Sequence, residues 1–154
     1  MKDKTILLVE DNDDDAELTE RALRRSQIKN PLVRAEDGVV ALEYLHGEGA
    51  YADRDIRELP QVVLLDLNMP RMGGLEVLKR IRAHPVTELL PVVILTTSKE
   101  EKDLVQAYRN HANSYMQKPV DFLEFTEAMR TLGLYWILVN ASPPDHKKLT
   151  DDKP

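Results

Sequence analysis

The chain has 154 residues, with 21 Lys and Arg against 27 Asp and Glu, a formal net charge of -6 and no cysteine. This length suits one compact domain, and the absence of cysteine excludes disulfides, thiolate metal sites and cysteine nucleophiles. The acidic balance disfavours direct binding to nucleic acid or to an anionic membrane. Because no stretch reaches the roughly 20 apolar residues of a membrane span, we expect a soluble, cytoplasmic protein.

Strand-like and helix-like segments alternate along the first half of the chain. The first expected strand, 6–9, is an apolar run, and the expected helix 13–27 follows with apolar residues at helical spacing. A short strand at 31–35 and a helix at 38–45 come next. The polar stretch 47–60 contains glycine and proline and reads as a long loop, with at most one helical turn.

The second half repeats this alternation three times. We expect strands at 62–65, 91–95 and 114–117, and helices at 74–83, at 99–111 and from Asp121 onward. Several strands are nearly continuous Val, Ile and Leu runs, which indicate burial on both faces of a parallel sheet covered by helices. The fold class is therefore α/β, doubly wound. We expect the domain to occupy 1–141 and the polar, proline-containing residues 142–154 to form a disordered tail.

Polar side chains stand at the ends of four of these strands. Glu10 and Asp11 follow the first strand, and the later strands end in Asp66, Thr96 and Lys118. In open α/β sheets the carboxyl ends of the strands form the binding edge. Carboxylates about 5 Å apart repel each other by about 3 kcal/mol at an effective dielectric constant near 20. A hard divalent cation such as Mg²⁺ relieves that repulsion, and an aspartate beside it can accept a phosphoryl group.

Each of these residues also has an ordinary structural explanation. An acidic residue after a strand often caps the next helix, and Asp11, Asn12 or Asp13 could do so here. Thr96 and Lys118 could equally be turn residues. The joint pattern favours a site, because all these residues fall at the same end of their strands.

Four motifs carry a resemblance to the receiver domain of two-component response regulators. They are LLVEDN (7–12), LLDLNMPRMGG (64–74), ILTTS (94–98) and YMQKP (115–119). They occur in family order, and the resemblance covers roughly residues 4–130. It implies a flavodoxin-like (βα)₅ fold with a five-stranded parallel sheet of order 2-1-3-4-5.

The resemblance also implies a role for each motif residue. Asp66 matches the phosphoacceptor, and Lys118 matches the lysine that contacts the phosphoryl group. Thr96 and Tyr115 match the switch pair that reorients on phosphorylation. Mg²⁺, with Mn²⁺ as a possible substitute, is the implied cofactor, and its implied ligands are Glu10, Asp11, Asp66 and the backbone carbonyl of Asn68. Gly73 and Gly74 are expected to supply positive φ in the loop after Asp66.

The long 47–60 loop and the VEDN and LTTS variants of the motifs point to one subgroup of the family. In these features the chain is similar to the response regulators associated with phytochromes in cyanobacteria and other bacteria. The implied phosphoryl donor is a sensor histidine kinase, specifically a phytochrome, and the implied target is an unknown downstream protein. Such a protein is a phosphoacceptor switch with self-directed phosphotransfer and autodephosphorylation, and not a conventional enzyme.

The last helix carries an apolar seam with steps of three and four residues. The residues of the expected interface are Phe122, Phe125, Met129, Leu132, Tyr135 and Trp136. One face of this helix can pack on the sheet, and the other needs a partner. We expect homodimerisation through the segment 99–117 and this helix. The alternative is a shorter helix, followed by an apolar strap folded onto the same domain.

Two other functions use similar residues. A haloacid-dehalogenase-like phosphatase also places an aspartate nucleophile and Mg²⁺ after a strand. Such enzymes carry the pattern Asp-x-Asp, in which the second aspartate is the acid/base, but position 68 here is Asn. A flavodoxin-like cofactor protein requires a Ser, Thr or Gly-rich phosphate loop after the first strand. Residues 10–15 are acidic instead.

Overall fold

Five β/α pairs follow one another in the computed structural model, which describes residues 4–118 and 121–133. The strands are β1 (Ile6–Val9), β2 (Leu32–Ala35), β3 (Val62–Leu65), β4 (Val92–Thr96) and β5 (Ser114–Gln117). The helices are α1 (Asp13–Arg25), α2 (Gly38–His46), α3 (Gly74–Ala83), α4 (Glu101–Arg109) and α5 (Phe122–Gly133), with a short 3₁₀ helix η1 (Gly49–Tyr51). Within the described residues, no helix is both long and apolar enough to cross a membrane.

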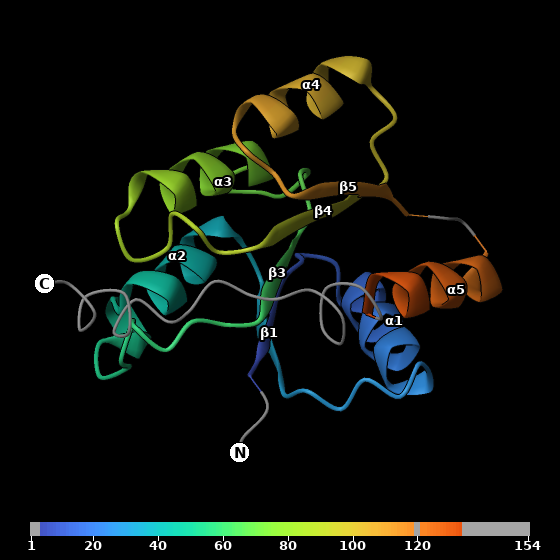
Figure 1. Cartoon of the computed structure of the whole chain (residues 1–154), viewed down its shortest axis with the longest axis horizontal. Coiled ribbons are helices and arrows are strands. Elements are labelled where there is room, and N and C mark those ends of the chain that lie inside the picture. Colours follow the sequence, from blue (N-terminus) through green and yellow to red (C-terminus); the bar gives the residue numbers. More distant parts are fainter. Residues whose placement is uncertain (1–3, 119–120, 134–154) are drawn as a thin grey trace, which may run out of the picture.

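The strands form one parallel sheet of order β2-β1-β3-β4-β5. Helices α2, α3 and α4 cover one face, and α1 and α5 cover the other (Figure 1). The doubly wound fold expected from the sequence is confirmed.

The sheet separates two layers of core side chains, because successive strand residues point to opposite faces. Facing α2, α3 and α4 are Leu7, Val9, Val63, Leu65, Val92 and Ile94. Facing α1 and α5 are Ile6, Leu8, Val62, Leu64, Val93 and Leu95. All are at most 2% exposed, which is why these strands read as continuous apolar runs and not as alternating ones.

Two helices are shorter than their apolar patterns predict. The first ends at Arg25 and not at residue 27, because Gln27 adopts a left-handed φ of 64° that a helix cannot continue through. The fourth covers Glu101–Arg109 and not 99–111. At its start, the Ser98 hydroxyl donates to Asp103 (2.6 Å), and it accepts from the Glu100 backbone N–H (3.3 Å). Ser98 thus organises a turn ahead of the helix.

The expectation that Gly73 and Gly74 supply positive φ is wrong. The left-handed residue of this loop is Arg71, with φ of 65°. Gly74 is needed for a different reason, because a Cβ there would lie 2.2 Å from the backbone oxygen of Asp66. The close approach of α3 to the end of β3 therefore depends on a residue without a side chain.

The long loop after α2 is held by Arg54. Its guanidinium lies 4.1 Å from the centre of the Tyr44 ring and donates to the Tyr44 backbone oxygen (2.8 Å). Tyr44 in turn packs edge-on against Tyr51 of η1, with ring centres 5.1 Å apart. The single helical turn that the sequence allows in this loop is η1.

Helix α5 packs on its own chain through part of the predicted dimer seam. Asp121 caps the helix, accepting from the backbone N–H groups of Leu123 (2.7 Å) and Glu124 (3.2 Å). Phe125 and Met129 are 6% and 0% exposed inside the core layer of α1, so they do not form a surface for a second copy, and their assignment to an interface is wrong.

The reason for this error is that a three-and-four spacing is the same for a helix packed on its own sheet as for one packed on a partner. Phe122 is half-buried beneath Arg21, whose guanidinium lies 5.5 Å from the ring centre. The side chain of Leu132 and all of Tyr135 and Trp136 lie outside the part that the structure describes, as does the expected tail at 142–154.

Candidate functional site

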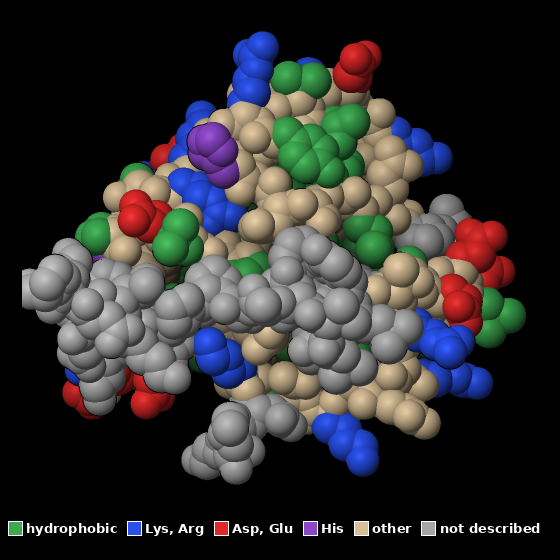
Figure 2. All heavy atoms as spheres, in the orientation of Figure 1, with side chains coloured by type: hydrophobic (Ala, Val, Ile, Leu, Met, Phe, Trp, Pro, Cys, Tyr) green, Lys and Arg blue, Asp and Glu red, His purple; other side chains and the backbone are tan. Residues whose placement is uncertain are grey.

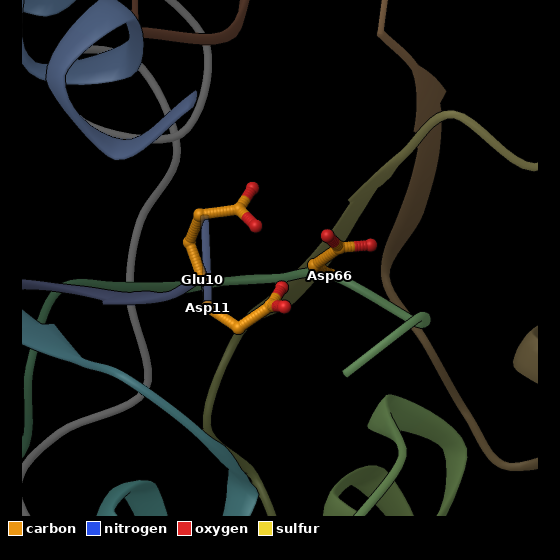
Figure 3. Close-up of side chains that lie close together, drawn as sticks. All are labelled: Glu10, Asp11 and Asp66. Carbon is orange, nitrogen blue, oxygen red and sulfur yellow. The ribbon is translucent and has the colours of Figure 1, made fainter. Parts of the chain in front are cut away.

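Three carboxylates meet beyond the ends of β1 and β3. Glu10 and Asp11 follow β1 and Asp66 follows β3, and their side chains lie side by side in Figure 3. One oxygen of each lies within 4.8 Å of the others. Glu10 and Asp66 are 1% and 8% exposed, whereas Asp11 is open to solvent. The juxtaposition expected from the sequence is therefore present.

This set of donors fits a hard divalent cation. All three are carboxylates, which suit Mg²⁺ or Mn²⁺, and the exposed Asp11 leaves one side open for water ligands. Burial raises the pKa of Glu10 to about 7, against the opposing influence of Lys118 and with a further rise from Asp66. Carboxylates held this close in a buried place favour either a proton or a cation among them.

Backbone hydrogen bonds that continue past the strand ends fix these side chains. The N–H of Glu10 donates to Ala35 O (3.1 Å), and the N–H of Asp66 donates to Val9 O (3.1 Å). Asn68 donates its N–H to Asp66 Oδ1 (3.2 Å), which orients the carboxylate within its own turn. The side chain of Asp66 therefore projects from a rigid strand end.

The loop that follows Asp66 is tied to α2. Arg71 Nε lies 3.3 Å from Asp37 Oδ2, while Asp37 Oδ1 caps α2 by accepting from the Val40 N–H (3.0 Å). Asp37 is 8% exposed, so this is a half-buried pair. Asn68, whose carbonyl is expected to face the metal, lies in sequence between Asp66 and Arg71.

Lys118 enters the cluster from the end of β5. Its Nζ contacts Glu10 Oε1 and lies 3.3 Å from Asp15 Oδ2 and 3.5 Å from Asp66 Oδ2. Its side chain is only 7% exposed. Burial alone lowers the pKa of Lys118, but the Glu10 hydrogen bond and the surrounding carboxylate charges outweigh burial and raise it. Lys118 is therefore a fixed cation directly beside Asp66.

The two expected switch residues lie on the neighbouring strands β4 and β5, where Thr96 pairs with Gln117 and Tyr115 pairs with Ile94. Thr96 ends β4 fully buried, and its Oγ1 accepts from the Ser98 N–H (3.3 Å). Tyr115 on β5 is half-buried and donates its hydroxyl to Ser98 O (3.2 Å). Burial raises the pKa of Tyr115. Both residues are thus connected to the loop between β4 and α4.

Two residues of the site were not expected from the sequence. Arg34 of β2 donates through Nε (3.1 Å) and Nη2 (3.0 Å) to the backbone oxygen of Glu10, and through Nη1 to Asp13 (2.7 Å). It thereby grips the loop that carries Glu10 and Asp11. Asp15 contacts Lys118 as described above. An arginine in a strand and one acid among several carry no distinctive sequence signal, so neither stood out.

The sequence matches the response regulator receiver domain over residues 6–130. This chain belongs to that family.

Similar proteins include a probable regulatory protein and a response regulator. The probable methanogenesis regulatory protein FilR2 of Methanothrix harundinacea is 41% identical over 90% of this chain and 86% of its own length. The response regulator Rcp1 of Synechocystis is 35% identical over 87% of this chain and 89% of its own length. These relatives place the chain in two-component signalling. The match also removes the phosphatase and flavodoxin-like alternatives.

Solved receiver structures share the fold closely. The phosphorylated cyanobacterial phytochrome response regulator RcpA superposes with a TM-score of 0.85 at 35% identity, covering 92% of this chain and 99% of its own. The Mn²⁺-bound form of Rcp1 gives a TM-score of 0.83 at 34% identity, covering 91% and 99%. The similarity to phytochrome response regulators expected from the sequence is confirmed.

Proposed function

We propose that this receiver is a phosphoacceptor switch in which Asp66 takes a phosphoryl group from a phosphohistidine. A carboxylate oxygen of Asp66 attacks phosphorus as the phosphorus–nitrogen bond to the imidazole breaks, so that an aspartyl phosphate forms. The observation that carries the proposal is the placement of Asp66 between two further carboxylates and the buried ammonium of Lys118. Loss of the phosphoryl group to water returns the receiver to its starting state.

Glu10, Asp11, Asp66 and the backbone carbonyl of Asn68 are the residues that would hold Mg²⁺ here. When bound, the ion supplies positive charge that offsets the charge gathering on the transferring group. Lys118 stabilises the phosphoryl oxygens from the other side. The Thr96 hydroxyl is a donor for one of those oxygens, and its shift would release the Ser98 turn that also holds Tyr115.

The donor that we infer is a sensor histidine kinase of the phytochrome class, acting in the cytoplasm. Support for the class comes from the similarity to RcpA, which is a phytochrome response regulator by name. The output we propose is binding of a further protein once Tyr115 and the β4–α4 loop have changed position.

We further propose that two copies associate through α4, β5 and α5. Hydrophobic side chains gather at the surface over α4 (Figure 2). Leu104, Val105 and Tyr108 of α4 are 38%, 39% and 50% exposed, which is unusual for three large apolar residues on one helix. The apolar surface thus lies on α4 and not on the buried seam of α5.

The decisive experiment is phosphoryl labelling of the purified chain by acetyl phosphate or a phosphorylated kinase with Mg²⁺. We expect wild type to gain one phosphoryl group and Asp66→Asn to gain none, because the attacking oxygen is gone. Asp53→Asn, an exposed acid in the 47–60 loop, is the matched control and should label normally. Labelling that persists in Asp66→Asn would refute the assignment.

A further inference from the structure

The first turn of α1 holds three consecutive acids, and they face different surroundings. Asp13 pairs with Arg34 (2.7 Å) and Asp15 pairs with Lys118 (3.3 Å). Asp14 is exposed and has no ion pair among the residues that the structure describes. Because successive helix residues are turned about 100° apart, only Asp15 of the three reaches Lys118 beside Glu10 and Asp66.

The backbone of Asp15 is fixed by two hydrogen bonds in the first turn of α1. The N–H of Asp15 donates to Asn12 Oδ1 (2.9 Å), which caps α1, and its carbonyl accepts from the Thr19 hydroxyl (2.8 Å). Its side chain is 40% exposed, whereas that of Lys118 is 7% exposed. Both line a cavity of about 240 Å³ between α1 and α5 that Leu18 and Phe125 also line. Asp15 therefore meets the ammonium from the helix side of the sheet edge.

We propose that Asp15 is a positioning residue of the phosphoacceptor site, which draws the Lys118 ammonium toward α1 and so competes with the phosphoryl group for it. The inference rests on the proposed function. Lys118 contacts three carboxylates, of which Glu10 and Asp66 belong to the cation cluster. Asp15 is outside that cluster, so a divalent cation bound to Glu10 and Asp66 does not take the place of Lys118 on Asp15.

This competition predicts that removing the Asp15 charge strengthens binding of a phosphoryl mimic. To contact an anion on Asp66, the Lys118 ammonium must give up its contact with Asp15 or divide itself between the two. A half-exposed ion pair of this kind changes a dissociation constant by a factor of about three to five. Asp15 thereby limits how firmly the receiver holds its phosphoryl group.

The test uses beryllium trifluoride, which mimics a phosphoryl group on aspartate, titrated into the full chain at saturating Mg²⁺. Asp15→Asn should lower its dissociation constant about three- to fivefold. Asp14→Asn makes the same change in net charge one residue away. The factor by which it changes the dissociation constant should be less than about half of the factor for Asp15→Asn. Asp15→Glu, which restores the carboxylate, should return the constant toward the wild-type value.

Two further measurements separate positioning from general effects. The dissociation constant for Mg²⁺ alone should rise more in Asp15→Asn than in Asp14→Asn, because a Lys118 ammonium released from Asp15 stays on the cation ligands Glu10 and Asp66. Urea unfolding should show that both variants are folded. Equal effects of the two variants on beryllium trifluoride, no effect, or weaker binding in Asp15→Asn would overturn the inference. Failure of wild type to bind beryllium trifluoride at all would instead count against the proposed function.

Discussion

Gly74 begins α3 with its Cα pressed against the strand end that carries Asp66. A Cβ at this position would lie 2.2 Å from Asp66 O and 2.8 Å from the Cα of Leu67, which are both backbone atoms that cannot swing aside. The adjacent Gly73 is different, because its Cβ would meet only Leu67 O at 3.6 Å. Two neighbouring glycines thus serve unequal purposes.

We therefore predict that Gly74→Ala lowers the free energy of unfolding by about 2–3 kcal/mol, because the backbone must shift to admit the methyl group. Gly73→Ala should change it by less than about 1 kcal/mol. Urea unfolding of both variants checks this. Equal losses would show that the close approach at Gly74 is not the cause.

His46 stacks on His84, with ring centres 4.1 Å apart and planes 15° from parallel. Burial lowers the pKa of His46, and the charge of His84 lowers it further. The folded state therefore binds fewer protons at His46 than the unfolded chain, whose imidazole has a pKa of about 6.5. The contribution of His46 to stability is complete above that pH and is lost as the pH falls below it.

We predict that the advantage of wild type over His46→Gln in the free energy of unfolding shrinks as the pH falls from about 7 to about 5. The comparison must be a difference, because Glu10 has a raised pKa and acts in the opposite direction over the same range. In His84→Gln, nuclear magnetic resonance of the ring protons should show the His46 midpoint moving upward. A constant advantage across this range would contradict the prediction.

At the scale of elements, Arg82 of α3 joins two loops at the sheet edge remote from Asp66. It donates through Nη1 to Leu90 O (2.6 Å) and Glu88 O (3.0 Å) before β4, and through Nη2 to His111 O (2.8 Å) and Asn113 Oδ1 (2.9 Å) before β5. Burial lowers the pKa of its guanidinium. One side chain thus satisfies acceptors from two connections, including the left-handed residue His111.

We predict that Arg82→Met lowers the free energy of unfolding by about 2–4 kcal/mol, because several acceptors lose their donor together. Arg80→Met on the same helix removes an exposed pair with Glu76 (3.1 Å) and should cost only about 0.3–0.5 kcal/mol. Urea unfolding measures both. Labelling of Asp66 should persist in Arg82→Met below the unfolding transition, since the two edges of the sheet are separate.

The elements themselves were predictable where burial leaves a strong pattern. The apolar runs of β1, β3 and β4, together with the acids that follow β1 and β3, locate both the sheet and its binding edge. Some of the features that the sequence does not predict depend on which face of a helix a side chain lies on. Nothing in the run Asp13–Asp15 shows which acid faces Lys118, and the spacing of Phe125 and Met129 is the same for an inward as for an outward face. The left-handed φ of Arg71 has no signal beside two glycines.

At the scale of the molecule, the apolar surface of α4 suits self-association through a two-fold interface. We predict that the chain sediments at twice its 17.6 kDa monomer mass at micromolar concentration. Leu104→Asp should shift it to the monomer, because it places a charge in the apolar contact. Leu89→Asp, at a residue 55% exposed in the loop before β4, is the control and should leave the dimer intact. A wild-type monomer, with and without phosphorylation, would disprove this interface.

The contact between Lys118 and Glu10 joins residues 108 positions apart. During synthesis on the ribosome, the acids of β1 and β3 emerge long before the lysine of β5. A nascent chain that has grown only through β4 carries the acceptor aspartate but lacks its neighbouring ammonium. On the proposed function, competence to accept a phosphoryl group therefore arises late in translation, when the fifth strand joins the sheet.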